Sequence, residues 1–268
     1  MRAGWNPARG NRKVGTKARG HGQDNRLTIP GHRRDALFFF ERLGSCVVVE
    51  RWIAGRGIVF LVEAPRPGWF HPCTIDDVCL ALSRIPGEHL AVIDLVVMRQ
   101  PTRKQEVISP VWGRAIFAFE GAGHQGAAIV LEAKDNKPYS WPASLAPDQV
   151  RELERLREDG HEVRRTKRRF EIVATAESTR NTVLYRTLLH ELGHHVDRAR
   201  FDARQWEGRT SMQKEDFAHR YAAEALALLR RSGVAPFARS FDAQGMRQEG
   251  LAPEWFAAAE RAFAETAD

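Results

Sequence analysis

Residues 190–197 read HELGHHVD and carry the pattern on which the interpretation of this chain depends. Residues four apart on an α-helix point the same way one turn apart, so the side chains of His190 and His194 can reach a single ion. Glu191 lies about 100° around the helix from His190, beside the ion rather than on it. That position suits a base acting on water at a metal. The competing interpretation is an exposed polar helix face on which the H-E-x-x-H spacing is accidental.

The residues around this motif predict a helix from about residue 182 to residue 200, with Asn181 or Thr179 as its N-cap. One apolar stripe, at steps of three and four residues, predicts the buried face: Tyr185, Leu189, Leu192, Val196 and Ala199. Gly193 lies inside the helix, although glycine costs about 1 kcal/mol relative to alanine in a helix interior. We therefore expect a neighbouring element to need the space beside His194.

A second helix is predicted within residues 210–233, TSMQKEDFAHRYAAEALALLRRSG. Thr210 and Gln213 form a capping-box pattern at its start. Ser232 and Gly233 are typical of a helix end.

A catalytic zinc site needs a third protein ligand besides the two histidines, with a fourth position left open. The second helix offers Glu215 and, farther on, Glu224. Glu215 shares one helix face with Ala218, His219 and Ala222, and small alanine side chains there would let the two helices approach closely. Because Glu224 sits in mid-helix and farther along, we expect Glu215 to be the third ligand.

The rest of the chain is expected to form an α+β domain, because strand-like segments come first and helices come last. The predicted strands are 46–52, 57–64, 89–98, 114–120, 127–133 and 170–176, and the predicted helices are 36–44, 74–87 and 144–160. Residues 36–268 are expected to form one domain, with residues 36–88 as a candidate N-terminal subdomain.

Some of these elements carry more specific expectations. Thr74 is expected to be the N-cap of the helix that it opens. Ser144 or Pro147 is expected to begin the later charged helix. The strands 127–133 and 170–176 could supply an edge with which a peptide pairs, or could be ordinary core strands.

The net charge of +7 lies entirely in residues 1–35. This segment has nine Lys or Arg residues against two acidic residues, and the remainder of the chain is neutral on average. It has few large apolar residues, so it cannot bury enough surface to offset its ordering entropy and is predicted to be disordered. Such a basic tail is a candidate for nonspecific contact with nucleic acid, and a solvated leader is the alternative.

Three features bear on the compartment. No apolar run approaches the roughly 18–20 residues that span a bilayer. The N-terminus lacks the apolar region of a secretory signal. Cys46, Cys73 and Cys79 follow no CxxC spacing and cannot form a closed set of disulfides, so they are expected to be reduced packing thiols. These features predict a cytoplasmic protein that makes no membrane contact.

The pattern HELGHHVD followed by EDFAHRYA, residues 215–222, resembles the gluzincin branch of the HExxH zinc metallopeptidases. It is most similar to the anthrax lethal factor-like peptidase domain, and it is also similar to metallopeptidases that cleave phage-type repressors. The resemblance covers roughly residues 170–230. It implies a zincin-like domain over 36–268, with a mixed sheet followed by the active-site helix and a helical C-terminal part.

Carried over position by position, the resemblance implies that His190, His194 and Glu215 bind Zn²⁺ and that Glu191 is the general base. The chain departs from the pattern in the second helix. Relatives of this kind often have an acid one turn after the third ligand, where this chain has His219. The residue that stabilises the oxyanion is not assigned by the motif, and the candidates are His219 and Tyr221.

Asp197 lies one turn beyond the second motif histidine, and three roles are open to it. It could accept a hydrogen bond from a ligand imidazole. It could instead be a rival ligand, or a surface acid paired with Arg198 or Arg200. The first and the last of these roles are equally favoured.

The function predicted from these residues is zinc-dependent endopeptidase activity on a protein or peptide substrate, through water that Glu191 activates at the zinc. The first alternative is a DNA-associated regulatory protein with a structural or idle zinc site. The second is a binding protein that needs no metal. Stoichiometric zinc that is lost in a His190→Ala variant would eliminate the second alternative.

Overall fold

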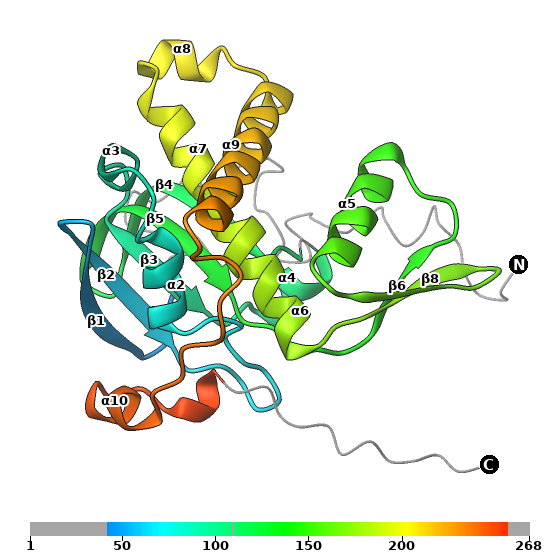
Figure 1. Ribbon diagram of the computed structural model, residues 1–268, viewed down its shortest axis with the longest axis horizontal. Coiled ribbons are helices and arrows are strands. Elements are labelled where there is room, and N and C mark those ends of the chain that lie inside the picture. Colours follow the sequence, from blue (N-terminus) through cyan, green and yellow to red (C-terminus); the bar gives the residue numbers. More distant parts are fainter. Residues whose placement is uncertain (1–41, 109, 257–268) are drawn as a thin grey trace, which may run out of the picture. The chain divides into compact units, whose positions relative to one another are not determined.

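The computed structural model describes residues 42–108 and 110–256, all of which lie within one compact unit, Phe39–Asp268 (Figure 1). Met1–Phe38 forms a second unit that lies outside the described residues. The predicted basic tail and most of the predicted helix 36–44 therefore lie outside them as well. The last residues of that helix, 42–44, are described and are not helical, which corrects its predicted end at Gly44.

A five-stranded mixed sheet with the order β1-β2-β3-β5-β4 forms the centre of the unit. Its strands are β1 (Cys46–Ile53), β2 (Arg56–Glu63), β3 (Leu95–Arg99), β4 (Gly113–Gly121) and β5 (His124–Glu132). The β1–β2 and β4–β5 pairs are antiparallel, and β3 pairs in parallel with both β2 and β5. Because β2 pairs with β3, the candidate subdomain 36–88 contributes strands to the main sheet and is not separate from it.

The β1 and β2 strands form a hairpin that closes through a two-residue turn. Ala54 and Gly55 both have positive φ angles, +49° and +82°. That combination is the one that matches the right-handed twist of paired strands, and glycine adopts it at little cost. The turn thereby fixes the register in which Ile53 pairs with Arg56.

Short helices flank the hairpin and the next strand. Helix α2 (Ile75–Leu82) begins as predicted, since the Thr74 side chain accepts a hydrogen bond from the backbone of Asp77 in a capping box. The predicted strand 89–98 is mostly wrong. Its first residues belong to helix α3 (Gly87–Leu90), and only β3 is extended. Leu90 and Ile93 are buried without being paired in the sheet, so their apolar character indicated burial and not strand conformation.

A smaller three-stranded antiparallel sheet follows, with the order β6-β8-β7. Its strands are β6 (Tyr139–Pro142), β7 (Glu162–Arg165) and β8 (Arg169–Val173), and helix α5 (Pro147–Glu158) lies between β6 and β7 in the chain. Of the two predicted starts for this helix, Ser144 and Pro147, the second is confirmed, because Pro147 is the first helical residue. Leu153 from α5 packs with Phe170 and Ile172 from β8 in a small separate core.

The two strands predicted as candidate peptide-pairing edges are both interior strands. The segment 127–133 lies in β5, which is hydrogen-bonded on both sides by β3 and β4. The segment 170–176 supplies β8, which is hydrogen-bonded on both sides by β6 and β7. Neither strand has a free edge for a peptide. Within the described residues, the two edge strands of the five-stranded sheet are β1 and β4.

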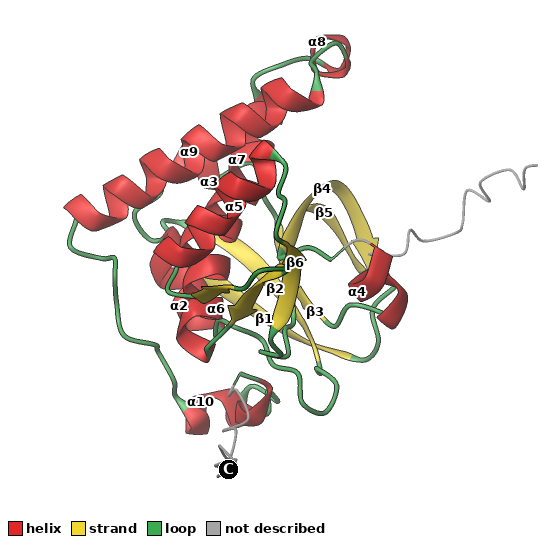
Figure 2. Cartoon of the chain, turned by 90° about the vertical axis from the view of Figure 1, so that its right-hand side faces the viewer, coloured by secondary structure: helices red, strands yellow, loops and turns green. Residues whose placement is uncertain are grey.

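The C-terminal part is helical, as predicted. It contains α6 (Ala176–Asn181), a π-helical stretch η2 (Thr182–Thr187), α7 (Leu188–Ala199), α8 (Ala203–Glu207), α9 (Ser211–Arg231), α10 (Ala243–Gln248) and the 3₁₀ turn η3 (Pro253–Trp255). Another short helix, α4 (Arg103–Ile108), precedes β4. Figure 2 shows α7 and α9 side by side beyond one face of the sheet.

The predicted N-cap of the motif helix is wrong. The helix begins six residues earlier, at Ala176, because the Thr175 side chain accepts a hydrogen bond from the backbone of Ser178. Asn181 has helical backbone angles, and the Thr179 hydroxyl donates to the Asn136 side chain instead of capping a helix. The predicted apolar stripe is buried except for Ala199.

A buried ion pair connects three segments that are distant in the sequence. Asp77 of α2 accepts hydrogen bonds from Arg180 of α6 at 3.0 and 2.9 Å, and from the Ser240 backbone at 3.0 Å. Arg180 also donates to the Phe237 carbonyl oxygen at 3.2 Å. This network fixes the segment that follows α9 to the helix that leads into the HELGH motif.

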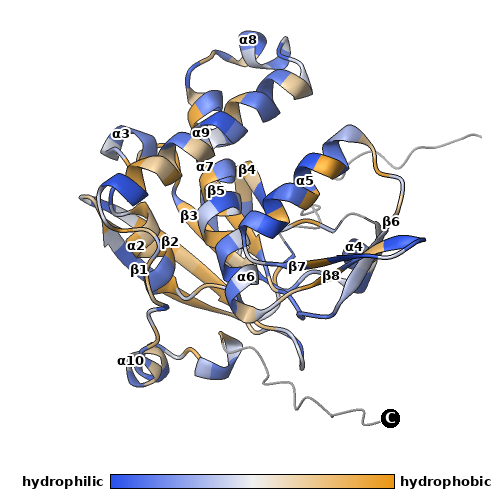
Figure 3. Ribbon diagram, turned by 45° about the vertical axis from the view of Figure 1, so that its right-hand side comes forward, coloured by the Kyte–Doolittle hydropathy of each residue, from blue (hydrophilic) through white to orange (hydrophobic). Residues whose placement is uncertain are grey.

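The described unit is of the α+β class with a mixed sheet and several helices, which confirms the predicted class. Apolar residues concentrate on the central strands and on the helix faces turned toward them (Figure 3). No helix in the described part of the chain is long and apolar enough to cross a membrane. Cys73 is buried, and Cys46 and Cys79 are partly buried; all three are free thiols, as expected.

Candidate metal centre

Helices α7 and α9 approach closely at Gly193. A Cβ atom placed there would lie 3.0 Å from the Cα atom of Ala218 and 3.1 Å from the Cβ atom of Tyr221. Only glycine fits without displacing the neighbouring helix. The prediction that another element needs the space beside His194 is therefore confirmed, and that element is the helix that carries Glu215.

The three predicted ligands lie together at this crossing. The Nε2 atoms of His190 and His194 are 3.1 Å apart. The Glu215 carboxylate lies 3.3 Å from the first of these atoms and 3.6 Å from the second. Donor atoms at about 2.0–2.2 Å from a tetrahedral zinc ion are separated by about 3.3–3.5 Å. The observed triangle fits that size, so these residues could hold the ion.

The exposure of the three side chains leaves one side of the triangle open. The two histidine side chains are each 14% exposed, whereas Glu215 is 54% exposed. Burial lowers the pKa of His194 to about 4, so its imidazole is neutral at pH 7. A neutral imidazole is the form that binds a metal.

His219 lies at the margin of the same cluster. Its ring centroid is 4.5 Å from that of His190. Single ligand atoms of His190, Glu215 and His219 lie within 4.8 Å of one another, so these three residues could also hold a metal ion. The Nε2 atom of His219 is 3.4 Å from a guanidinium nitrogen of Arg155 on α5. His219 is therefore an additional candidate ligand that the sequence analysis did not assign to the metal.

Glu191 is buried between α7 and the first residues of β4. A Cβ atom on Gly113 would clash with the Thr187 Cγ2 atom at 2.7 Å and the Val130 oxygen at 2.8 Å, and it would lie 3.4 Å from the Glu191 Cγ atom. The glycine therefore lets the strand lie close to Thr187 and beside Glu191. Burial raises the pKa of Glu191 to about 7, while the nearby His190 and a hydrogen bond from the Ala115 backbone act in the opposite direction. Glu191 lies beside the three ligands and not among them, which is the predicted position for a base.

Tyr221 and Glu224 are not brought to the site. The Tyr221 hydroxyl lies 3.1 Å from Nδ1 of His89, and its Cβ atom lies beneath Gly193. Tyr221 is therefore a packing residue at the helix crossing. Glu224 is exposed and lies nine residues after Glu215, about 13 Å farther along the helix.

Of the three predicted roles, only the pairing with Arg200 is found, and Asp197 is buried instead of lying at the surface. It is fully buried, and it accepts a hydrogen bond from Arg209 at 2.9 Å. Arg200 lies 3.8 Å away. Arg209 also donates to the backbone oxygen of Gln213 in the first turn of α9. Asp197 therefore fixes the start of α9, and with it the position of Glu215, from the end of α7.

Three contributors to the site were missed by the sequence analysis. The start of β4 lies against Glu191, and Arg155 reaches His219 from α5, more than sixty residues earlier in the chain. The third is His195, whose Nε2 atom lies 3.0 Å from the Ala128 carbonyl oxygen, which ties α7 to β5. The only sequence signal for any of these three was Gly113, because a glycine at the start of an apolar strand often marks a close approach of another segment.

The arrangement places two imidazoles, one carboxylate and a separate buried carboxyl group around a partly open position next to a sheet edge. Such a set can bind a divalent cation of the zinc type and move a proton next to it. No protein-family model matches the chain, and neither a curated protein nor a solved structure matches it.

Proposed function

We propose that this protein is a zinc-dependent endopeptidase with a zincin-like fold. The observation that carries the proposal is the triangle of 3.1, 3.3 and 3.6 Å formed by two histidine nitrogens and the Glu215 oxygens. A chance H-E-x-x-H on one helix accounts for two of these donors. It does not account for a carboxylate from a second helix at ligand distance from both.

Zinc held by His190, His194 and Glu215 would act as a Lewis acid, making water more acidic and polarising a carbonyl group. Glu191 is the residue placed to take a proton from that water and to deliver it to the leaving amine. Its side chain is held by the Ala115 backbone of β4, so its carboxylate has a fixed position next to the ligands.

His219 is the candidate for the donor that stabilises negative charge on the substrate oxygen. Arg155 can only donate hydrogen bonds, so its contact at 3.4 Å favours the tautomer in which Nε2 of His219 accepts. The Nδ1 atom then carries the proton and can donate it to a substrate. Burial lowers the pKa of His219 to about 4, which keeps the ring neutral at pH 7.

The peptide would bind along β4. This strand ends the five-stranded sheet, and its residues Gly113 to Ala115 lie against Glu191. A peptide that adds to a sheet edge pairs through its main chain, without regard to its termini. Because β4 continues for several residues beyond Ala115, a bound chain would extend past the ligands, which favours cleavage within a chain over removal of a terminal residue.

The test uses Glu191→Gln with Glu224→Gln as the matched control. We expect the wild type to contain about one zinc per chain and to cleave members of a random peptide pool. Glu191→Gln should keep its zinc and lose about 10²- to 10⁴-fold in rate, because the amide has no proton affinity. Glu224→Gln should behave as the wild type does.

Two results would contradict this function. Equal cleavage by wild type and Glu191→Gln would remove Glu191 from the mechanism. Bound zinc without cleavage of any peptide would favour the regulatory alternative with an idle metal site. Zinc content is measured by plasma mass spectrometry on each purified protein, and cleavage by mass spectrometry of the peptide pool.

A further inference from the structure

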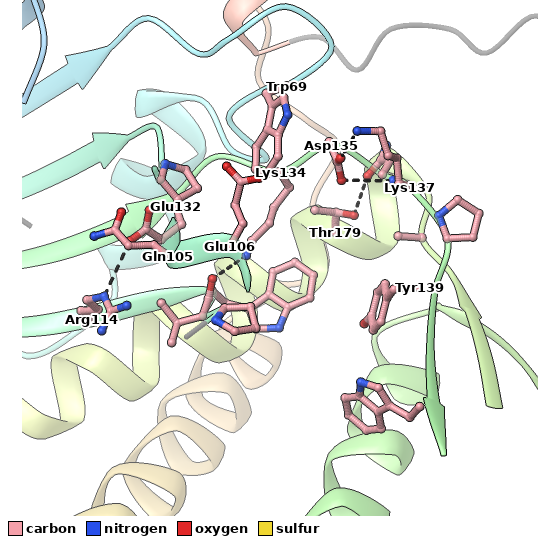
Figure 4. Close-up of a pocket in the computed structure, with 18 residues that line it drawn as sticks. Trp69, Gln105, Glu106, Arg114, Glu132, Lys134, Asp135, Lys137, Tyr139 and Thr179 are labelled. Atoms are coloured by element: carbon pink, nitrogen blue, oxygen red, sulfur yellow. Dashed lines mark hydrogen bonds and ion pairs between the residues drawn. The ribbon is translucent and has the colours of Figure 1, made fainter. Parts of the chain in front are cut away.

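A pocket of about 420 Å³ adjoins the start of β4 (Figure 4). Val111, Trp112 and Arg114 line it, and the intervening Gly113 lies against Glu191. Neighbouring strand residues are about 3.3 Å apart. The pocket therefore begins within three strand residues of Gly113, where the chain contacts Glu191, the proposed base. It lies only toward the N-terminal end of β4.

Aromatic side chains from separate segments form its walls. The lining includes Trp69 from the loop after β2, Trp112 from the start of β4, and Tyr139 and Trp141 from β6. Figure 4 shows Trp69 and Tyr139 bordering the pocket, with Glu132 and Arg114 on the other side. Each of the four rings is only partly buried, so aromatic surface remains uncovered within the pocket.

The charged groups on its inner side are already paired with one another. Glu132, which is almost fully buried, lies 3.5 Å from Arg99 and 3.7 Å from Arg114. The Lys134 ammonium lies 4.3 Å from the centre of the Trp112 ring and donates to a backbone oxygen. These charges compensate each other without a ligand.

The charged groups at the rim are paired in the same way. Asp135 and Lys137 are in contact at 2.8 Å, and Glu106 is paired with Arg66. A charged occupant would lose hydration and compete with these pairs. An uncharged occupant would cover ring surface and leave every pair intact.

We propose that this pocket binds one large uncharged side chain, aromatic or aliphatic, of a peptide held along β4. The inference rests on the proposed function and gives it a substrate class: chains with such a residue within about three positions of the cleaved bond, on one side of it. A volume of about 420 Å³ admits an aromatic ring system, and burying one against four rings uses the offset and edge contacts that aromatic groups prefer.

The test compares two pocket variants with one control. Ala174→Phe fills the pocket from its wall, and Trp69→Ala removes a ring that sits in a loop. Trp52→Ala is the control, because Trp52 is 75% exposed on β1 and does not line the pocket. Each substitution is made in the wild type and in zinc-loaded Glu191→Gln, and melting temperatures establish that each protein is folded.

Two readouts are taken with a random peptide pool. The first is the set of cleaved bonds produced by the active proteins, and the second is the set of peptides retained by the Glu191→Gln proteins. We expect large uncharged residues to be enriched at a single position on one side of the bond. The preference should fall roughly ten-fold or more in Ala174→Phe and Trp69→Ala, and should persist in Trp52→Ala. If Ala174→Phe does not fold, Trp69→Ala carries the comparison.

The outcomes separate this inference from the proposed function. Cleavage without a positional preference, or with a preference that both pocket variants retain, overturns the inference and leaves the peptidase function standing. A second outcome is that the Glu191→Gln proteins retain peptides with the expected preference, that the pocket variants lose this preference, and that the wild type cleaves nothing. This outcome supports the pocket proposal and contradicts the peptidase function. If the wild type cleaves no peptide and the Glu191→Gln proteins retain none selectively, both proposals are contradicted.

Discussion

Replacement of Gly193 by alanine tests whether the crossing of α7 and α9 sets the position of Glu215. In an isolated helix this change would stabilise the chain by about 1 kcal/mol, because glycine is a poor helix former. Here the added Cβ atom would meet the Ala218 Cα atom at 3.0 Å and the Tyr221 Cβ atom at 3.1 Å. Ordinary carbon contacts lie at about 3.5–4.0 Å, so α9 would have to retreat by a few tenths of an ångström.

The cost of such overpacking is typically about 1–3 kcal/mol. Subtracting the gain in helix propensity leaves a net loss of about 0–2 kcal/mol, or about 2–4 °C in melting temperature for each kcal/mol at this chain length. Glu215 lies one turn before Ala218 on the same helix, so it would move with α9. We expect zinc affinity to fall by about 10- to 100-fold, as when groups that orient metal ligands are lost.

The assay measures melting temperature and zinc affinity for Gly193→Ala and for Gly87→Ala. Gly87 begins α3, and a Cβ atom there would have no neighbour within 4 Å. The control should therefore match the wild type or exceed its stability slightly. A Gly193→Ala protein that is at least as stable as the wild type and binds zinc equally well would refute the reasoning, because the helices would then tolerate the added carbon.

Three further predictions follow from other parts of the structure. Chelation of the metal should lower the melting temperature of the wild type and of Glu224→Ala, but it should have no effect on Glu215→Ala, which lacks the third ligand; an unchanged wild type would contradict this. Asp77→Ala should destabilise the unit by about 3–5 kcal/mol in urea unfolding, because it leaves the buried Arg180 guanidinium without its partner; a loss below about 1 kcal/mol would show the pair to be dispensable. Burial lowers the pKa of His71 to about 4, below the unfolded value of about 6.5, so its contribution is complete above pH 6.5 and is lost as the pH falls toward 4. His71→Gln should therefore reduce the slope of stability against pH in that window by up to about 1.4 kcal/mol per pH unit, and identical slopes would contradict the assignment.

Local features of the sequence predicted the elements whose ends are set by short-range chemistry. The hairpin at Ala54 and Gly55, the cap at Thr74 and the capping box at Thr210 all depend on residues within four positions of each other. The strand predicted at 89–98 failed because burial alone does not distinguish a strand from a short helix and loop. Leu90 is buried on α3 just as the residues of β3 are.

In the candidate site too, the sequence predicted the residues that are close in the chain and missed the partners that come from distant segments. The histidines and Glu191 are related by helix periodicity, so the sequence placed them correctly relative to one another. The partners that come from distant segments could not be found this way, since periodicity says nothing of which strand lies against the helix. Asp197 illustrates the limit, because its buried contact with Arg209 depends on how the chain turns between α7 and α9.

Two structural features argue that the ligand triangle is not an accident of one helix. Gly193 sits inside α7, where alanine would favour the helix by about 1 kcal/mol, and its absent side chain is what admits α9. Asp197 is a buried carboxylate that accepts a hydrogen bond from Arg209, and Arg209 in turn fixes the first turn of α9. Both features set the same quantity, the distance from Glu215 to the two histidines, and neither is needed by a helix that merely exposes a polar face. A binding protein without a metal would show only the change in stability that the contact with α9 causes in Gly193→Ala, and would not change in any other property. A metal centre would lose affinity for its ion with the same substitution, so the single variant distinguishes the two readings.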